Sequence, residues 1–155
     1  IKIAQENSAR VGVGERLHFE VMNASKLRFE DNSYDMVFSS GMLHSLRTPD
    51  KVARILRESY RVLKLGGEMW IYDPARICSG IDTRMWQASL SVAERFLYWL
   101  FTLWELVNPP HYYKWREIAP IAAATGFNAY WVEEKEDEIR VKLRKPEYVG
   151  AGRSS

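Results

Sequence analysis

Two short apolar strands flank one amphipathic helix, and this arrangement limits the available folds more than any other feature of the chain. Residues 35–39 have a continuous apolar centre, which is typical of a strand buried on both faces. Residues 69–72 form a second apolar run that Pro74 stops. Between them, apolar residues recur at helical spacing over residues 52–63. A strand, a helix and a strand in this order predict parallel strands in a layered α/β sheet.

The ends of the helix carry their own signals. Thr48 suits the N-cap position and Pro49 the first helical position. Lys64 falls in the expected last turn, where a cation complements the helix dipole. Gly66 and Gly67 are expected to end the helix, because glycine adopts the left-handed conformation found at helix C-termini.

Further elements are expected on both sides of this unit. Residues 1–10 indicate the end of a helix, and the alternation of apolar residues over 17–21 indicates a short strand. Downstream, residues 82–107 predict a long helix with few polar positions, which should be covered on most sides. Residues 114–125 predict a helix that contains Pro120 and is ended by Gly126. Residues 128–133 and 138–144 predict a closing hairpin. The expected fold is therefore α/β, with a mostly parallel sheet and a C-terminal antiparallel hairpin strand.

Length and composition suit one domain. The chain has 155 residues, of which 46% are apolar and 27% charged, with a net charge of +2. We expect a single domain over residues 1–145, a helical aromatic insert over 76–113 and a flexible tail over 146–155. The lysines and arginines are scattered among acidic residues, which argues against nucleic acid as a partner.

Several site and location classes are disfavoured by the residue pattern. The single cysteine, Cys78, allows no internal disulfide, and together with the absence of a signal sequence it leads us to expect a cytoplasmic protein. The uninterrupted apolar run over 96–101 is far shorter than the roughly 20 residues that span a bilayer. The histidines and the cysteine show no zinc-ligand spacing, so no metal is expected.

Three segments carry a resemblance to a known family. Residues 31–46, 61–74 and 123–127 resemble, in order, three parts of the S-adenosylmethionine-dependent methyltransferases of the Rossmann-like class: the fourth strand with its following loop, the junction from helix to fifth strand, and the Ala-Gly-Phe element before the last two strands. The resemblance is strongest to the small-molecule branch that includes the quinone-biosynthesis methyltransferases. It implies S-adenosylmethionine as the cofactor.

The resemblance also implies cofactor-binding residues at the carboxyl ends of strands, where open α/β sheets bind their ligands. Asn23 matches the residue that hydrogen-bonds the adenine amino group, although the family usually has Asp there. Ala24 follows, with a backbone N–H that faces the ring. Ser39, Ser40 and Gly41 match the residues that line the methionine end.

The sequence also offers candidate catalytic and substrate-binding residues. His44 takes the first place of a Leu-His-His-Leu pattern in which Ser45 replaces the second histidine. It is either a general base or substrate-positioning group, or a loop histidine that caps or packs. Tyr72 and Asp73 either orient the nucleophile or have a structural role, because Asp-Pro also serves as a turn signal. The candidates for a substrate pocket are Tyr72, Trp86 and Tyr112, of which Trp86 and Tyr112 are alternatively core or dimer packing residues.

The resemblance places the family's first strand, Gly-rich loop and second strand before Ile1, so the expected fold is N-terminally truncated. Gly12 and Gly14 are no substitute, because they follow a helix and precede a strand. Without these partners the strand over 35–39 has an open apolar edge. We expect self-association, relocation of residues 17–21 to this edge, or a segment supplied from elsewhere.

Two classes of function remain open from the sequence. The first is methyl transfer from S-adenosylmethionine to a small, apolar or aromatic acceptor. The second is a non-catalytic fragment or remnant that acts as an oligomerising or partner-binding module, with homo-oligomers formed through the strand edge or the aromatic helix. A dinucleotide-dependent oxidoreductase is disfavoured, because the chain has no Gly-rich fingerprint.

Overall fold

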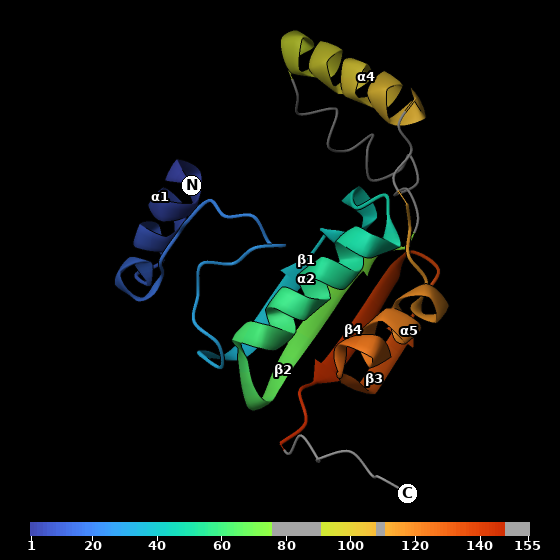
Figure 1. Cartoon of the computed structure of the whole chain (residues 1–155). Coiled ribbons are helices and arrows are strands. Elements are labelled where there is room, and N and C mark those ends of the chain that lie inside the picture. The colour runs from blue at the N-terminus through green and yellow to red at the C-terminus, as the bar shows by residue number, and fades with distance from the viewer. Residues whose placement is uncertain (76–90, 108–110, 148–155) are drawn as a thin grey trace, which may run out of the picture.

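A computed structural model describes residues 1–75, 91–107 and 111–147 (Figure 1). Apart from the strand expected over residues 17–21, the helices and strands follow the predicted order, and two 3₁₀ turns lie at Gly14–Arg16 and Leu43–Ser45. The elements are α1 (Lys2–Arg10), β1 (Tyr34–Ser40), α2 (Pro49–Val62), β2 (Leu63–Pro74), α4 (Val92–Val107), α5 (Trp115–Thr125), β3 (Asn128–Glu134) and β4 (Glu138–Arg144). Trp86, most of the expected tail and the first part of the expected insert lie outside the described residues.

The sheet contains four strands in the order β1-β2-β4-β3. β1 and β2 are parallel, as the strand-helix-strand pattern predicts, and β4 is antiparallel to both of its neighbours. The C-terminal hairpin is therefore confirmed, and the described sheet is mixed. Figure 1 shows α2 and α5 packed on the same face of this sheet.

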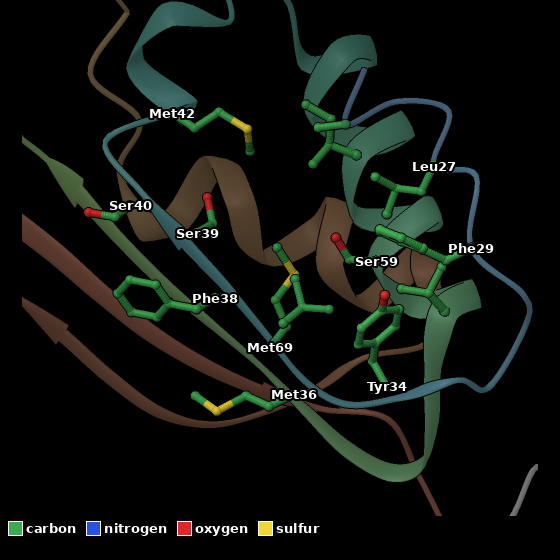
Figure 2. Close-up of a pocket in the computed structure, with 14 residues that line it drawn as sticks. Leu27, Phe29, Tyr34, Met36, Phe38, Ser39, Ser40, Met42, Ser59 and Met69 are labelled. Carbon is green, nitrogen blue, oxygen red and sulfur yellow. The ribbon is translucent and has the colours of Figure 1, made fainter. Parts of the chain in front are cut away.

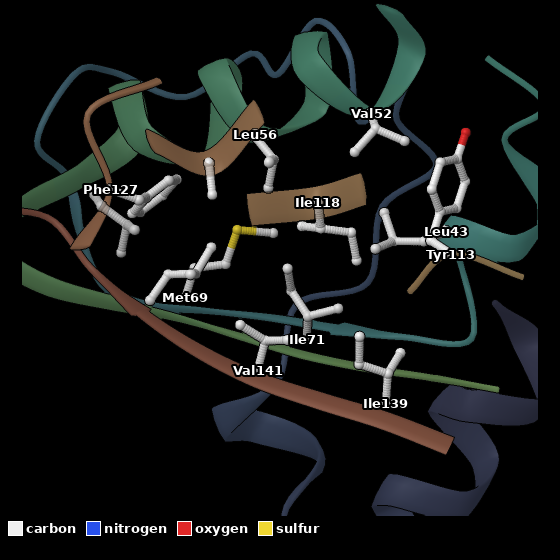
Figure 3. Close-up of a cluster of buried hydrophobic side chains, with 13 residues drawn as sticks. Leu43, Val52, Leu56, Met69, Ile71, Tyr113, Ile118, Phe127, Ile139 and Val141 are labelled. Carbon is white, nitrogen blue, oxygen red and sulfur yellow. The ribbon is translucent and has the colours of Figure 1, made fainter. Parts of the chain in front are cut away.

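The core lies between that face and the two helices (Figure 3). Alternate residues of β2 and β4 point into it, because successive side chains of a strand face opposite sides of the sheet. α2 contributes residues at i, i+3, i+4 and i+7, the spacing of one helical face. Thirteen buried side chains form this cluster: Leu43, Val52, Leu56, Leu63, Met69, Ile71, Tyr113, Ile118, Ala122, Phe127, Ile139, Val141 and Leu143.

The end of α2 differs from the prediction. The helix ends at Val62, and Lys64, Gly66 and Gly67 belong to β2. Leu63 is fully buried and already has an extended backbone, with φ −71° and ψ 137°. Burial of Leu63 in the core thus ends the helix earlier than the glycine signal indicates.

The strand predicted over residues 17–21 is wrong, because these residues form no strand. Leu17 and Val21 are exposed, by 48% and 78%. A strand needs a neighbour for its backbone hydrogen bonds, and no described strand pairs with this segment. Its expected relocation to the edge of β1 is wrong as well, since β1 pairs only with β2 among the described strands.

The expectation that β1 is buried on both faces is also wrong. Ser39 is buried, whereas Met36 and Phe38 are 44% and 58% exposed. α2 and α5 cover one face of the sheet, and no described helix covers the face that carries Met36 and Phe38. Among the described strands, β1 thus has one unpaired edge, and its uncovered face is apolar.

α4 stands apart from the sheet in Figure 1. Its large described side chains are exposed, from 41% for Leu103 to 84% for Val92. The expectation that this helix is covered on most sides is wrong for these residues. Among the described parts of the chain, no helix has the length and apolarity needed to cross a membrane.

Candidate functional site

The carboxyl ends of β1 and β2 lie side by side, because the two strands are parallel and Ser40 is in register with Tyr72. The chain turns immediately after β1, where the amide of Gly41 donates a hydrogen bond to the carbonyl oxygen of Tyr72 over 2.8 Å. The 3₁₀ turn Leu43–Ser45 follows directly. Ser40, the last residue of β1, and the loop residues Gly41 and His44, all predicted as functional, are thus close to the end of β2.

A cavity of about 450 Å³ opens between β1, α2 and the segment that precedes β1 (Figure 2). None of the described residues that line it carries a charge, so the cavity suits an apolar group. The lining residues are Ala24, Leu27, Phe29, Tyr34, Met36, Val37, Phe38, Ser39, Ser40, Met42, Ile55, Ser59, Val62 and Met69.

Three of the five predicted cofactor-binding residues meet in this cavity: Ala24, Ser39 and Ser40. The Oγ atom of Ser39 is buried and has no hydrogen-bond partner among the described residues. A buried hydroxyl without a partner costs free energy. A ligand with a polar group in the cavity would remove that cost.

The other two predicted cofactor-binding residues, Asn23 and Gly41, are not among the lining residues. The Oδ1 atom of Asn23 accepts hydrogen bonds from the amide and the hydroxyl of Ser25, over 2.9 and 2.8 Å. Its acceptor therefore closes a local turn. Gly41 has φ +60°, and a side chain there would meet only the Cε1 atom of His44, at 4.0 Å. The space beside Gly41 is open to a ligand.

Asp73 anchors the loop that carries His44. Its Oδ1 atom accepts a hydrogen bond from the amide of Leu43 over 2.9 Å, and its Oδ2 atom accepts one from the amide of His44 over 2.7 Å. Oδ2 also lies 3.4 Å from the Nδ1 atom of the His44 ring. Asp73 is only 3% exposed, and this burial raises the pKa of its carboxyl, although the two backbone hydrogen bonds oppose the shift.

Sequence reasoning left the role of Asp73 open between orienting the nucleophile and forming a turn. The signal that favoured a role in the site was an acidic residue at the carboxyl end of an apolar strand. The contacts with the loop cross 30 positions of the sequence, so only the tertiary structure reveals them.

The predicted substrate residues are only partly brought together. The Tyr112 ring lies nearly parallel to that of His44, with 6.2 Å between the ring centroids. Tyr72 packs against Phe38, with centroids 5.3 Å apart, and Phe38 lines the cavity. Trp86 lies outside the described residues.

Comparisons with known proteins place these observations in a family context. Residues 1–71 match the family described as "Methyltransferase domain". The ubiquinone/menaquinone biosynthesis C-methyltransferase UbiE of Pseudoalteromonas translucida is 32% identical over 73 residues, which are 47% of this chain and 28% of that protein. The demethylmenaquinone methyltransferase of Lactiplantibacillus plantarum is 33% identical over 87 residues, 56% of this chain and 35% of that protein. The matches thus span about a third or less of these relatives.

Solved structures show the same fold. A methyltransferase described as S-adenosylmethionine-dependent, from Methanosarcina mazei, has a TM-score of 0.63 and 20% identity, over 94% of this chain and 77% of its own. A similarly described methyltransferase from Aquifex aeolicus has a TM-score of 0.62 and 18% identity, over 94% and 63%. The [4+2]-cyclase SpnF has the same TM-score of 0.62 at 15% identity, over 94% and 63%. The last similarity illustrates that the fold alone does not determine the reaction.

Proposed function

We propose that this chain takes part in methyl transfer to a small acceptor. The chain has the Rossmann-like methyltransferase fold, and its first 71 residues are related to the S-adenosylmethionine-dependent methyltransferases. S-adenosylmethionine is the cofactor of this family. The acceptor that we propose is apolar or aromatic. The names of two relatives refer to ubiquinone or menaquinone compounds, and such acceptors match this description.

One observation carries the proposal: Ser39, whose buried hydroxyl has no hydrogen-bond partner among the described residues, lines the cavity at the carboxyl end of β1. Ser39 and Ser40 would hydrogen-bond the cofactor, and the open space at Gly41 would let it approach the backbone. The apolar lining would accept the adenine ring. When bound, S-adenosylmethionine supplies an electrophilic methyl group. The residues of this chain would position the reactants and exclude water.

The described lining fits only part of the cofactor. It offers no charged side chain for the carboxylate and ammonium of the methionine end. We therefore assign one wall of the cofactor site to Ala24, Ser39, Ser40 and Gly41. The partners of the methionine end would come from outside this described lining.

A second candidate function is an oligomerising or partner-binding module, and two exposed apolar surfaces favour it. One is the free edge of β1 with Met36 and Phe38. The other is a stripe on one side of α4, where apolar side chains recur at helical spacing. Its described members are Val92, Phe96, Trp99, Leu100, Leu103 and Val107. Apolar patches of this kind mark interaction sites in soluble proteins.

Calorimetric titration of the 155-residue chain with S-adenosylhomocysteine tests the proposal. We expect saturable heat in the micromolar range, and we expect Ser40→Trp, which places a bulky side chain at a residue that lines the cavity, to abolish it. The matched control is Ser45→Trp, an exposed serine in the neighbouring loop that does not line the cavity. No heat at millimolar ligand would favour the second candidate function instead.

A further inference from the structure

The carboxylate of Asp73 contacts His44 twice, through its backbone and through its ring. The Oδ2 atom of Asp73 accepts the His44 amide over 2.7 Å and lies 3.4 Å from Nδ1 of the same residue. The other oxygen, Oδ1, accepts a hydrogen bond from the amide of Leu43. The buried Asp73 side chain, at the end of β2, thus holds the backbone of the loop and also lies beside the Nδ1 atom of the His44 ring.

The main chain of His44 is held from its other side as well. The amide of His111 donates a hydrogen bond to the His44 carbonyl oxygen over 3.0 Å. The hydroxyl of Tyr113, a residue that is 1% exposed, donates to the carbonyl oxygen of Leu46 over 2.8 Å. Leu43 is fully buried in the core. With its backbone fixed in this way, the His44 ring has only its own side-chain torsions to vary.

The surroundings of Nδ1 determine where the ring carries its proton. Nδ1 is buried, and no polar atom of the described residues meets hydrogen-bond geometry with it; the Oδ2 atom of Asp73 lies 3.4 Å away. A lone pair on Nδ1 would face the lone pairs of a carboxylate, which is repulsive. A proton on Nδ1 would instead be attracted to it, and a small rotation of the ring would shorten the 3.4 Å contact into a charge-assisted hydrogen bond.

We propose that Asp73 is a positioning residue that holds neutral His44 as the Nδ1–H tautomer and so leaves Nε2 to accept a proton from the methyl acceptor. The inference rests on the proposed function. In the proton-transfer step, the bond between the acceptor atom and its hydrogen breaks, and a bond from that hydrogen to Nε2 forms. The electron pair stays on the acceptor atom, which becomes the nucleophile. The imidazolium that results is stabilised by the Asp73 carboxylate.

This arrangement selects a class of acceptor. A base assists only a group that must lose a proton, and it is most effective when the acidity of that group approaches the acidity of imidazolium. A hydroxylated aromatic ring or an enolisable carbon acid meets both conditions. We therefore infer an aromatic hydroxyl or enol acceptor.

The chain contains a matched control for this contact. His111 pairs with Glu117, with 2.9 Å between Nε2 and Oε1, but both side chains are substantially exposed, by 47% and 37%. Here the carboxylate faces Nε2 and not Nδ1. The two histidines therefore should differ in tautomer: His44 as Nδ1–H and His111 with its proton on Nε2.

Two-bond ¹H–¹⁵N correlation spectra of the full chain with ¹⁵N-labelled histidine, at a pH where the rings are neutral, test the proposal without cofactor or acceptor. The variants His44→Gln and His111→Gln assign the signals. We expect Nδ1–H to be the major form of His44. We expect Asp73→Asn to lower the ratio of Nδ1–H to Nε2–H by about tenfold, equivalent to roughly 1.4 kcal/mol. Glu117→Gln should leave the His44 signals unchanged.

Two results would overturn the inference. One is a wild-type spectrum in which His44 is mainly Nε2–H, a result that needs no variant to fold. The other is an unchanged tautomer ratio in a folded Asp73→Asn chain. Because the experiment contains no ligand, its outcome is separate from the titration with S-adenosylhomocysteine, which tests the proposed function.

Discussion

The ammonium of Lys145 donates a hydrogen bond to the carbonyl oxygen of Leu63 over 2.7 Å, and this contact ties the end of the last strand to the first residue of β2. The same ammonium donates to the Tyr60 carbonyl and to Asn32 Oδ1, each over 2.8 Å. It also lies 4.6 Å from the centroid of the Tyr60 ring. Lys145 thus satisfies carbonyl groups at the end of α2 that have no partner within the helix.

Replacing Lys145 with Met should destabilise the fold strongly. Lys145 is only 6% exposed, so the substitution would leave two carbonyl groups and an amide oxygen without their donor. We expect a loss on the order of 2–4 kcal/mol in the free energy of unfolding. Urea denaturation followed by circular dichroism measures it. Lys64→Met is the control, because Lys64 pairs with Asp35 at an exposed site, and such pairs contribute about 0–1 kcal/mol. Equal losses in the two variants would contradict this account.

Gly67→Ala should also destabilise the chain, for a steric reason. A Cβ atom at this position would lie 2.8 Å from the carbonyl oxygen of Lys64 and 3.1 Å from that of Asp35. Both are backbone atoms, which cannot turn aside as a side chain does. We expect a loss of about 1–3 kcal/mol by the same denaturation measurement. The control is Leu65→Ala, at an exposed neighbouring position, which should change the stability much less. A Gly67→Ala chain as stable as wild type would show that the backbone around Gly67 accommodates a side chain.

The stability should depend on acid pH through Glu68. The Arg144 guanidinium at 2.6 Å, with hydrogen bonds from Trp70 and Tyr130, lowers the pKa of the Glu68 carboxyl to about 2. In the unfolded chain this pKa is about 4.3. Because the folded-state pKa is the lower one, the stabilisation is present above the unfolded value and is lost as the pH falls from about 5 toward 2.

Comparison of wild type with Glu68→Gln over this pH range measures the contribution. The difference in unfolding free energy between the two chains should be largest above about pH 5 and should shrink toward pH 2. Asp35→Asn is the control, since Asp35 forms an exposed ion pair with Lys64. A difference between wild type and Glu68→Gln that does not change with pH would contradict the assignment.

Self-association is the predicted consequence of the exposed apolar surfaces. Sedimentation velocity should show species larger than the monomer that depend on concentration. If the β1 edge mediates association, Phe38→Lys should shift the distribution toward monomer, whereas Trp99→Ser should do so if the α4 stripe mediates it. A wild-type chain that remains monomeric at all concentrations would contradict the homo-oligomer proposal.

The sequence was sufficient for the elements whose partners lie within the described chain. The parallel pair β1 and β2 and the closing hairpin were predicted because each strand has its neighbour in a predicted element. The segment over 17–21 has the alternation of a strand but no described neighbour, so its pattern misled. The helix α2 ended early because burial of Leu63 outweighed the glycine signal.

The position of the candidate site could be predicted, but its contacts could not. The family resemblance pointed to Ser39, Ser40 and Gly41 as candidates, and the parallel register of β1 and β2 explains why they lie beside the end of β2. The hydrogen bonds that Asp73 accepts from the amides of Leu43 and His44 join distant parts of the sequence, and no local sequence pattern predicts them. Asn23 was assigned to the adenine by position alone, and its bonds with Ser25 depend on a turn that the sequence did not indicate.

We propose that the cavity beside β1 is one wall of the S-adenosylmethionine site. A titration of the ¹⁵N-labelled chain with S-adenosylhomocysteine, followed in amide ¹H–¹⁵N spectra, tests this assignment. We expect saturable shifts concentrated at Ala24, Ser39, Ser40 and Gly41, with the hairpin β3–β4 unaffected. Absence of shifts at millimolar ligand, or shifts confined to α4 or the hairpin, would contradict it.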